Sequence, residues 1–530
     1  MLNTIMARGG MVVAPHHLAA SIGADIIRDG GNAIEAMVAA AAGIAVCYPH
    51  MNGLGGDNFW LIHSPGKTPM GIDSCGAAAE LASIDFYREH SLDVIPGRGP
   101  LAALTMAGAV SGWQRALKFS KDHWGGRMPL DRLLAPAIDY ARSGVLVTHT
   151  LADNALVKLV ELQYQPGFAE QYLVSGRPVQ YGETLRQRAL ADTLENLAHV
   201  GLEDFYHGDI ARSMARDLET LGSPLRLSDF VRHESLTLEP LKLTVAGHQV
   251  YNMPPPTQGL ASLIILGVFD RLGIRGVDSF DFVHGLIEAT KCAFRIRDTQ
   301  VCDPVYMDID PQKFLDSSFL DSLAEGVDMK NASPWPDASA KGDTVWLGAI
   351  DAEGRAVSFI QSVYWEFGSG MILPGTGVTW QNRGTSFSLD PTNHNQLAPF
   401  KRPFHTIQPA LALLSDGRVM PYGTMGGEGQ PQTQAMIFVR HVLNNVGLQE
   451  AVSAPRWLLG RTWGSTKTNL RIEQRFNPVL YDSLRIAGHD IEQVGAFEEI
   501  MGHAGALVWH PDGLIEGAFD PRSDGAARTV

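Results

Sequence analysis

The sequence predicts an α/β protein in which stacked β-sheets are covered by helices. Strand-like runs occur in both halves of the 530-residue chain, and runs with helical spacing lie between them. Hydrophobic residues make up 45% of the sequence, which is enough to bury a large core. A sheet with an apolar face has to bury it against another layer, so strands in both halves favour sheets packed face to face. The sequence contains no internal repeat.

The first elements are expected in the order strand, helix, helix, strand. Met11–Ala14 is a short apolar strand, and Leu18–Arg28 has helical spacing that a pair of glycines ends. The next helix, Asn32–Val46, begins with an asparagine cap. A glycine-rich turn then leads into the apolar strand Phe59–Ile62.

The middle of the chain is mostly helical in its spacing. Helices are expected at Leu130–Ser143, Thr184–His199 and Gly208–Leu221. Alternating strand patterns follow over Leu236–Tyr251 and end at three consecutive prolines. Ser279–Asp298 has the pattern of a long amphipathic helix.

A polar connector, Lys330–Gly342, divides the sequence into two parts. It contains two prolines and several small residues, which are typical of an exposed loop. Beyond it, one helix is expected at Thr433–Leu443. The strand-like runs that follow the connector are Val345–Ile350, Ala356–Val363, Gly377–Asn382, Ala410–Ser415, Val419–Gly423, Leu470–Glu473 and Ala506–His510.

Charge and composition exclude several classes of partner. The formal net charge of −15 argues against nucleic acid and against anionic membranes, which bind basic surfaces. The first 13 residues have no long apolar stretch, and the most apolar run falls short of the roughly 18 residues of a membrane span. We therefore expect a cytoplasmic protein. The four cysteines lack zinc-ligand spacing, and the side chains of His16 and His17 should diverge, so we expect no metal.

The residue with the clearest chemical potential is Thr344, where the connector meets a strand. A threonine hydroxyl becomes an effective nucleophile when a base lies beside it, and the α-amine of an N-terminal threonine is such a base. The reference pKa of a free α-amine, about 7.7–8, suits this task. Exposing it requires cleavage of the Asp343–Thr344 bond, which the Thr344 hydroxyl can begin by attacking the preceding carbonyl. The alternative is an ordinary turn before a strand.

Two later stretches supply groups for the same chemistry. Pro403–Thr406 carries a histidine and a threonine, and Gly426 and Gly427 follow a predicted strand. Paired glycines allow two backbone N–H groups to point at one spot, as an oxyanion hole requires. The alternative for the glycines is a plain strand-to-helix turn.

Taken together, these motifs resemble the γ-glutamyltranspeptidase family of N-terminal nucleophile hydrolases over nearly the whole chain. The resemblance implies a four-layer αββα sandwich and a zymogen that cuts itself. It also implies a large chain (1–343) and a small chain (344–530) that stay together as one unit, with no cofactor. The matching stretches are Gly10–Ala14, Gly30–Ala33, Asn52–Gly56, Met253–Gly259, Glu288–Asp298, Asp351–Ser358, Phe367–Gly370 and Gly426-Gly427.

Carried over residue by residue, the resemblance makes Thr344 the nucleophile and Gly426 and Gly427 the oxyanion hole. Ser362 stands where the family has a threonine that hydrogen-bonds the nucleophile's amine, so the hydroxyl is retained. Tyr364 replaces an asparagine of the family and is expected to line the substrate pocket.

The residues that hold a glutamyl head group in the family are absent. Ile84 occupies the position of its arginine, and Arg383 and Ser386 replace a glutamine and an aspartate. The paired serines become His405 and Thr406. Loss of the aspartate disfavours an ammonium group, whereas a guanidinium favours a carboxylate. We therefore predict a small amide that carries a carboxylate. Within the family, the pattern resembles members that act on oxamate, which implies release of oxalate and ammonia in purine or ureide breakdown.

Several alternatives remain open from the sequence. Arg383 is either a substrate ligand or a surface residue, His405 is either a donor or a structural histidine, and Arg98 is either a second anion clamp or a solvated loop residue. Alternative functions are a γ-glutamyl hydrolase or transferase acting on glutathione-like compounds, and a cephalosporin-type acylase. A different class is an uncleaved, non-catalytic binding relative. A dimer of two-chain units is also considered.

Overall fold

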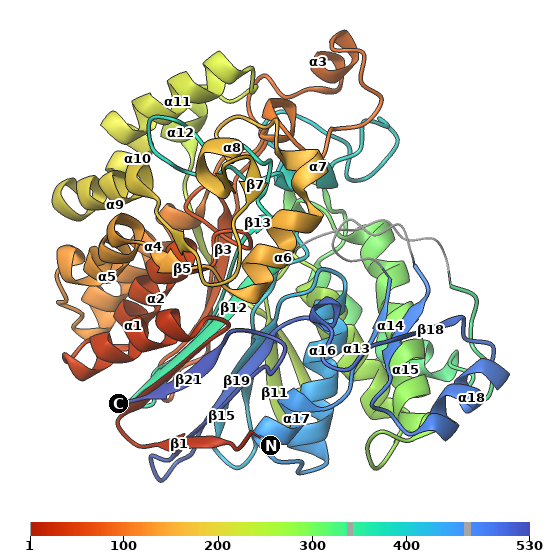
Figure 1. The fold of residues 1–530 in the computed structure, drawn as a ribbon. Coiled ribbons are helices and arrows are strands. Elements are labelled where there is room, and N and C mark those ends of the chain that lie inside the picture. The colour runs from red at the N-terminus through yellow and green to blue at the C-terminus, as the bar shows by residue number, and fades with distance from the viewer. Residues whose placement is uncertain (1, 336–342, 461–467) are drawn as a thin grey trace.

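Two seven-stranded antiparallel sheets form the centre of the molecule in a computed structural model, which describes residues 2–335, 343–460 and 468–530 (Figure 1). The first sheet has the order β21 (Ala526–Thr529), β2 (Gly10–Ala14), β12 (Asp343–Asp351), β13 (Ala356–Tyr364), β3 (Asp57–His63), β4 (Met70–Ser74) and β9 (Leu236–Leu238). The second has the order β1 (Ile5–Ala7), β20 (Ile515–Phe519), β19 (Ala504–Trp509), β15 (Val419–Thr424), β14 (Ala410–Leu413), β11 (His248–Asn252) and β10 (Leu241–Val245).

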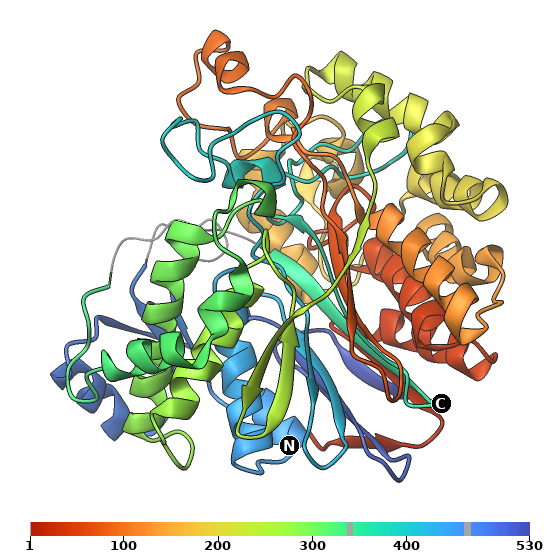
Figure 2. The same ribbon diagram turned by 180° about the vertical axis from the view of Figure 1, so that it is seen from behind.

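A layer of helices covers the outer face of each sheet, which gives the predicted αββα arrangement (Figures 1 and 2). The helices on the first sheet are α1 (His17–Arg28), α2 (Ala33–Cys47) and α4 (Ala109–Phe119), while α5 (Leu130–Ser143) packs on α2 and α9 (Arg188–Val200) packs on α5. The helices on the second sheet are α13 (Gly259–Arg271), α16 (Gly429–Phe438) and α17 (Leu448–Ser453), while α14 (Phe280–Gln300) and α15 (Ser317–Glu325) pack on α13.

Shorter elements surround this core. The additional helices are α3 (Ile84–Glu89), α6 (His149–Val157), α7 (Leu159–Leu162), α8 (Phe168–Tyr172), α10 (Asp204–His207), α11 (Asp209–Leu221), α12 (Leu227–Arg232) and α18 (Pro478–Ile486). The small sheets join β5 (Val145–Leu146) to β8 (Thr184–Leu185), β6 (Leu173–Val174) to β7 (Arg177–Pro178), and β16 (Trp457–Leu459) to β17 (Leu470–Glu473) and β18 (Ile491–Val494).

Local sequence accounts for the start of the buried helix α2. Its N-cap Asn32 accepts hydrogen bonds from the backbone of Ile34 and Glu35, and Glu35 reaches back to the backbone N–H of Asn32, which completes a capping box. Every residue of α2 is buried, because it lies between the first sheet and α5. A helix that is apolar on all sides is stable only in such a place.

The two sheets pack closely around Trp346 on β12. Its indole Nε1 donates to the hydroxyl of Ser358 at 3.0 Å. A Cβ atom on Gly423 or Gly505 of the opposite sheet would lie within 2.4 Å of the indole ring. Glycine is therefore required where the second sheet crosses this side chain.

The structure corrects several of the predicted elements. Residues 184–185 form strand β8, and the helix expected from Thr184 begins only at Arg188. Gly377–Asn382 is no strand and has only isolated bridges at Thr379 and Trp380. Residues 336–342 of the predicted connector lie outside the described part of the chain.

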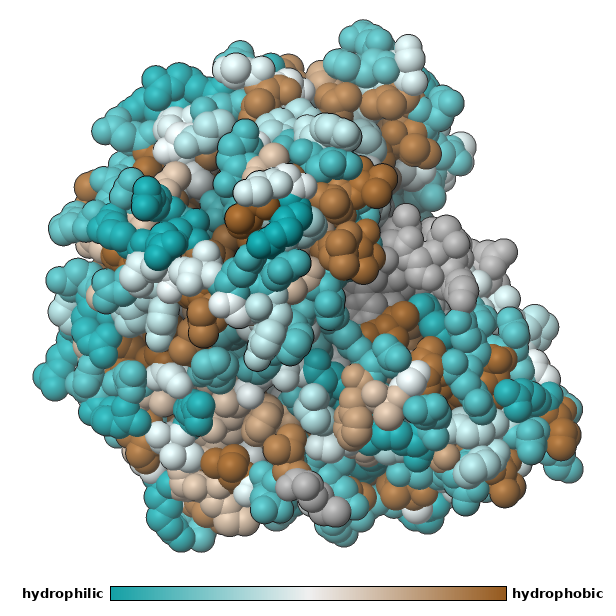
Figure 3. Space-filling view, in the orientation of Figure 1, coloured by the Kyte–Doolittle hydropathy of each residue, from teal (hydrophilic) through white to brown (hydrophobic). Residues whose placement is uncertain are grey.

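The surface in Figure 3 mixes polar and apolar side chains, with apolar groups over α6 and α7. Leu156, Val157 and Val160 are the exposed aliphatic side chains there. No helix among the described residues is long and apolar enough to span a bilayer.

Candidate active site

Thr344 is buried at the start of β12, where the ladder with β13 changes register. Asp343 pairs with Tyr364, whereas Val345 pairs with Gln361, so β13 carries one extra residue opposite Thr344. The side chain of Thr344 is fully buried. Such β-bulges occur frequently beside active sites because they re-aim side chains.

The end of β13 turns sharply beside Thr344. The backbone N–H of Tyr364 donates to Ser362 Oγ at 2.8 Å, and Ser362 pairs across the sheet with Asp57 at the start of β3. Tyr364 has φ 83°, a left-handed value that is unusual for a bulky residue. Holding such a residue there costs of the order of 1–3 kcal/mol, and strain of this kind concentrates at functional sites.

The predicted oxyanion turn lies between β15 and α16. Gly426 and Gly427 have φ 117° and 53°, so both adopt backbone conformations that favour glycine. The N–H of Gly429 donates to the carbonyl of Gly426 at 2.8 Å, which closes the turn. The positive end of the α16 dipole adds to the attraction for negative charge at this point.

Arg383 is buried in the 3-10 turn Arg383–Ser386, so the alternative of a surface arginine is wrong. Its guanidinium carbon lies 3.6 Å from the ring centroid of Tyr364, and Nη1 donates to Thr406 Oγ1 at 3.3 Å. Nε and Nη2 have no hydrogen-bond partner among the described residues. Burial lowers the pKa of Arg383 to about 10, so the side chain stays cationic near neutral pH.

Asp57, at the first position of β3, is a site residue that the sequence analysis missed. Its Oδ1 accepts hydrogen bonds from Gly76 N–H at 3.0 Å and Gly108 N–H at 3.1 Å. Its Oδ2 has no hydrogen-bond partner in the described part of the chain. Burial raises the pKa of Asp57 to about 7, against the opposing charge of Arg383. The available signal was an acidic residue between a glycine pair and an otherwise apolar strand.

His405 lies beside Asp57, with its Nε2 3.5 Å from Asp57 Oδ2. Burial and the nearby charges of Arg383 and Arg402 hold the pKa of His405 well below its usual range, so its imidazole is neutral. Neither ring nitrogen has a hydrogen-bond partner in the described structure. We call Asp57, Arg383, His405 and Thr406 the inner polar cluster.

A second group of buried side chains joins the inner polar cluster to the oxyanion turn. Gln258 Nε2 donates to the carbonyl of Thr406 at 2.6 Å and to that of Gly427 at 2.9 Å. Arg297 orients this amide by donating to Gln258 Oε1 at 3.0 Å, and it pairs with Glu428 at 2.8 Å. We call Gln258, Arg297 and Glu428 the anchor.

Three other sequence candidates have different surroundings. Ser386 ends the turn that Arg383 begins and is partly exposed. Ile84 begins α3, which lies at the edge of the molecule (Figure 1). Arg98 is not a solvated loop residue, because it donates to the carbonyls of residues 366 and 368 and pairs with Glu161 at 2.8 Å.

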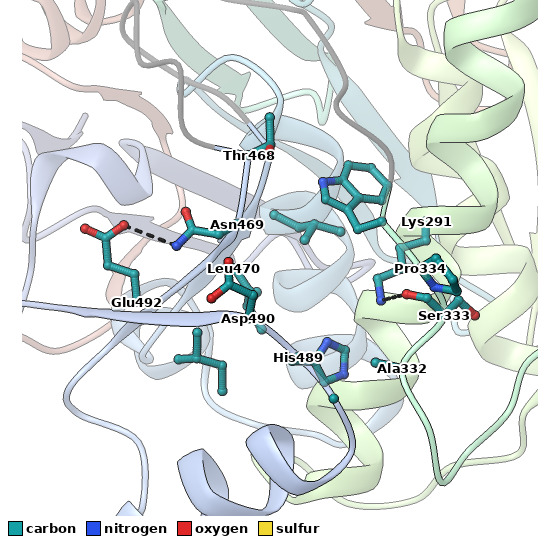
Figure 4. Close-up of a pocket in the computed structure, with 14 residues that line it drawn as sticks. Lys291, Ala332, Ser333, Pro334, Thr468, Asn469, Leu470, His489, Asp490 and Glu492 are labelled. Atoms are coloured by element: carbon teal, nitrogen blue, oxygen red, sulfur yellow. Dashed lines mark hydrogen bonds between the residues drawn. The ribbon is translucent and has the colours of Figure 1, made fainter.

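A cavity of about 810 Å³ beside α14 is lined by His489 and Lys291, among others (Figure 4). His489 also belongs, with His284 and Glu288, to the one group of described residues that is spaced for a metal ion. His489 Nε2 lies 2.8 Å from His284 Nδ1, and the other ring nitrogen of His284 lies 2.8 Å from a backbone carbonyl. Glu288 is paired with Lys291 at 2.8 Å. The side chains of this group therefore already have partners, and the positive charge of Lys291 repels a metal cation.

The pair His16 and His17 does not diverge as expected from the sequence. Their rings stack with centroids 4.9 Å apart. Nδ1 of His16 accepts a hydrogen bond from Leu18 N–H at 3.2 Å and so caps α1. The buried histidine has a structural use at this position.

The sandwich of two antiparallel sheets between helical layers is the fold of the N-terminal nucleophile hydrolases. The family model described as gamma-glutamyltranspeptidase matches residues 19–530. The chain therefore belongs to the γ-glutamyltranspeptidase family, and it is an enzyme of that hydrolase class.

Three similar proteins cover nearly the whole chain. The oxamate amidohydrolase proenzyme of Klebsiella pneumoniae is 54% identical and covers 98% of each chain. The glutathione hydrolase-like YwrD proenzyme of Bacillus subtilis is 38% identical over 99% of each chain. The crystal structure of cephalosporin acylase from Bacillus halodurans has a TM-score of 0.92 at 31% identity, covering 100% of this chain and 97% of that one.

Proposed function

We propose that this chain cuts itself between Asp343 and Thr344 and then uses Thr344 to hydrolyse a small amide that carries a carboxylate. The buried position of Thr344 at a bulge supports the cleavage step. Each central sheet contains strands from both sides of this bond, so the large chain of 343 residues and the small chain of 187 would stay interleaved.

The mechanism assigns both proton transfers to the α-amine of Thr344. The neutral amine accepts the hydroxyl proton while the oxygen attacks the amide carbonyl. Backbone N–H groups of Gly426 and Gly427 stabilise the oxyanion. The resulting ammonium returns the proton to the leaving nitrogen, so ammonia departs and an ester forms on Thr344. Water then attacks this ester, with the amine again as base, and the hydroxyl is restored.

The single observation that carries the substrate assignment is Arg383. This cation is buried, lies on the ring of Tyr364, and has Nε and Nη2 unpaired with any described residue. Two N–H groups along one edge of a guanidinium match the two oxygens of a carboxylate. Oxamate fits this receptor, since its carboxylate is bonded directly to the amide carbonyl. The similarity to an oxamate amidohydrolase proenzyme supports the same choice.

Ammonia release from matched amides tests this assignment. Oxamide has the size of oxamate but carries a second amide in place of the carboxylate. We expect the purified enzyme to prefer oxamate by about 100-fold in kcat/KM, because only oxamate pairs with the buried cation. Equal turnover of oxamide would contradict the role of Arg383.

An acylase is the second candidate, because one similar solved structure is that of a cephalosporin acylase. Faster turnover of a cephalosporin than of oxamate would favour it, and faster turnover of glutathione would favour a γ-glutamyl activity. A cytoplasmic location, a role in purine or ureide breakdown and a dimer of two-chain units also belong to the proposal. Fractionation, growth on oxamate and light scattering test them.

A further inference from the structure

Asp57 is placed to contact a ligand through only one of its two oxygens. Oδ1 is held by the N–H groups of Gly76 and Gly108, which fixes the plane of the carboxyl group. Oδ2 remains without a hydrogen bond to any described residue, as do both ring nitrogens of His405 and two nitrogens of Arg383. Buried polar atoms in proteins are nearly always paired, so such a group is expected to bind a small polar molecule.

Counting the charges of the inner polar cluster predicts how a ligand changes it. Without ligand, the cation of Arg383 faces the carboxyl group of Asp57, and His405 is neutral. A bound carboxylate adds one negative charge to a region with almost no exposure to water. An unpaired buried charge is costly, and uptake of one proton removes the excess.

We propose that Asp57 determines specificity by taking up one proton when a small carboxylate binds to Arg383, and that Oδ2–H then donates to the bound carboxylate. The proton comes from solvent, and no bond of the substrate changes in this step. The inference rests on the proposed function, in which Arg383 holds the carboxylate. Proton uptake by Asp57 explains how this aspartate and a substrate carboxylate can lie in one buried site without mutual repulsion.

The other titratable groups around Asp57 leave it as the proton acceptor. Burial raises the pKa of Cys75 and of Tyr206, so both stay protonated near neutral pH. His405 titrates well below neutral pH. The α-amine of Thr344 has to stay neutral to act as a base. Burial raises the pKa of Asp57 to about 7, so a ligand that raises it further drives proton uptake above that pH.

Pyruvate is a suitable probe, because a methyl group replaces the amide nitrogen of oxamate and the carboxylate is unchanged. We expect pyruvate to inhibit oxamate hydrolysis competitively. Its inhibition constant should rise about tenfold per pH unit above pH 7, because binding requires a protonated Asp57. In Asp57→Asn, whose side chain is always neutral, the constant should lose the rise that begins at pH 7 and depend on pH only through the α-amine of Thr344.

Asp351→Asn is the matched control, since Asp351 is also a buried aspartate on the first sheet but lies at the far end of β12. It should keep the pH dependence of the wild type. A pH-independent constant in the wild-type enzyme would overturn the role of Asp57 while leaving oxamate hydrolysis intact. Absence of both hydrolysis and inhibition would instead overturn the proposed function, and this inference with it.

If the Asp57→Asn variant fails to fold or to cut itself, proton uptake can be measured directly on the wild-type enzyme. Pyruvate is titrated into weakly buffered wild-type enzyme, and the change in pH is followed with an indicator. We expect uptake to approach one proton per site at pH 8.5 and to vanish at pH 5.5, where Asp57 is already protonated. No uptake at pH 8.5, with pyruvate bound, would overturn the inference.

Discussion

The inner polar cluster and the anchor are both buried and both polar, yet they use their hydrogen-bonding groups differently. In the anchor, all three guanidinium nitrogens of Arg297 and the side-chain amide of Gln258 have partners. In the inner polar cluster, Asp57, Arg383 and His405 each retain atoms without a partner in the described structure. The carbonyls of residues 406 and 427, both bound by Gln258, join the two regions.

This difference separates a scaffold from a binding site. A fully paired network holds its shape without a ligand, so the anchor is suited to fixing the oxyanion turn. A partly paired network is costly unless a ligand completes it. Burial alone therefore says little about function, whereas several neighbouring buried groups without partners, beside Thr406 and Tyr364, mark a place where a polar ligand can bind.

The largest effect is expected from Thr344→Ala. This change removes both the group that starts self-cleavage and the nucleophile of the hydrolysis, so the chain should remain at 530 residues and lose at least about 10⁴-fold in activity. Gel electrophoresis and ammonia release measure the two losses. A cut chain in this variant would assign the cleavage to another residue or to another protease.

Arg383→Ala should weaken carboxylate recognition. We expect KM for oxamate to rise about 100-fold while KM for oxamide changes little, because only oxamate pairs with the guanidinium. Arg98→Ala is the matched control, since the Arg98 side chain is only 8% exposed but donates to backbone carbonyls. Its ratio of the two KM values should match the wild type. Equal losses for oxamate and oxamide in Arg383→Ala would place Arg383 outside the site.

Gln258→Met tests the anchor as a positioning device. Loss of both donated hydrogen bonds frees the Gly427 carbonyl, so kcat should fall about 10- to 100-fold with little change in KM. Gln434→Met is the control, because Gln434 is a buried glutamine on α16 that donates to the carbonyl of Gln408. It should lower the melting temperature comparably and leave kcat near the wild-type value. A similar fall in kcat in both variants would reduce Gln258 to a structural role.

Asp57→Asn should change the pH dependence of stability, which is the smallest of these effects. The pKa of Asp57 is about 7 in the folded protein and about 3.9 in an unfolded chain, so the folded state binds the extra proton. Its contribution to the unfolding free energy is therefore lost as pH rises from about 4 through 7. The melting temperature of the variant relative to the wild type should increase between pH 5 and 8. A constant difference would contradict the raised pKa.

Where local sequence determines structure, the fold could be predicted closely. The predicted helix Leu130–Ser143 has the observed bounds, because its apolar face is clear and a glycine follows it. Helix α13 was missed, since Gly259–Arg271 is apolar on nearly all sides and lacks the 3.6-residue periodicity of apolar and polar residues that marks an amphipathic helix. The false strand at Gly377–Asn382 is held by scattered contacts with distant segments, which local propensity does not encode.

The candidate site was predictable only where a motif carries it. Thr344, Gly426 and Gly427 were selected from such motifs, and Arg383 from an exchange of residue type. The family resemblance carried the assignment of roles to all of them. Asp57 escaped notice because its importance comes from a neighbour 326 positions later in the sequence, Arg383, whose charge acts on it across the fold.

Intact-mass spectrometry of the purified protein, combined with ammonia release from oxamate on the same sample, tests the central claim most directly. The account predicts two chains, of 343 and 187 residues, with Thr344 at the start of the smaller one and one ammonia released per oxamate consumed. A single uncut chain that hydrolyses oxamate would contradict it, because Thr344 would then lack the free α-amine on which both proton transfers depend.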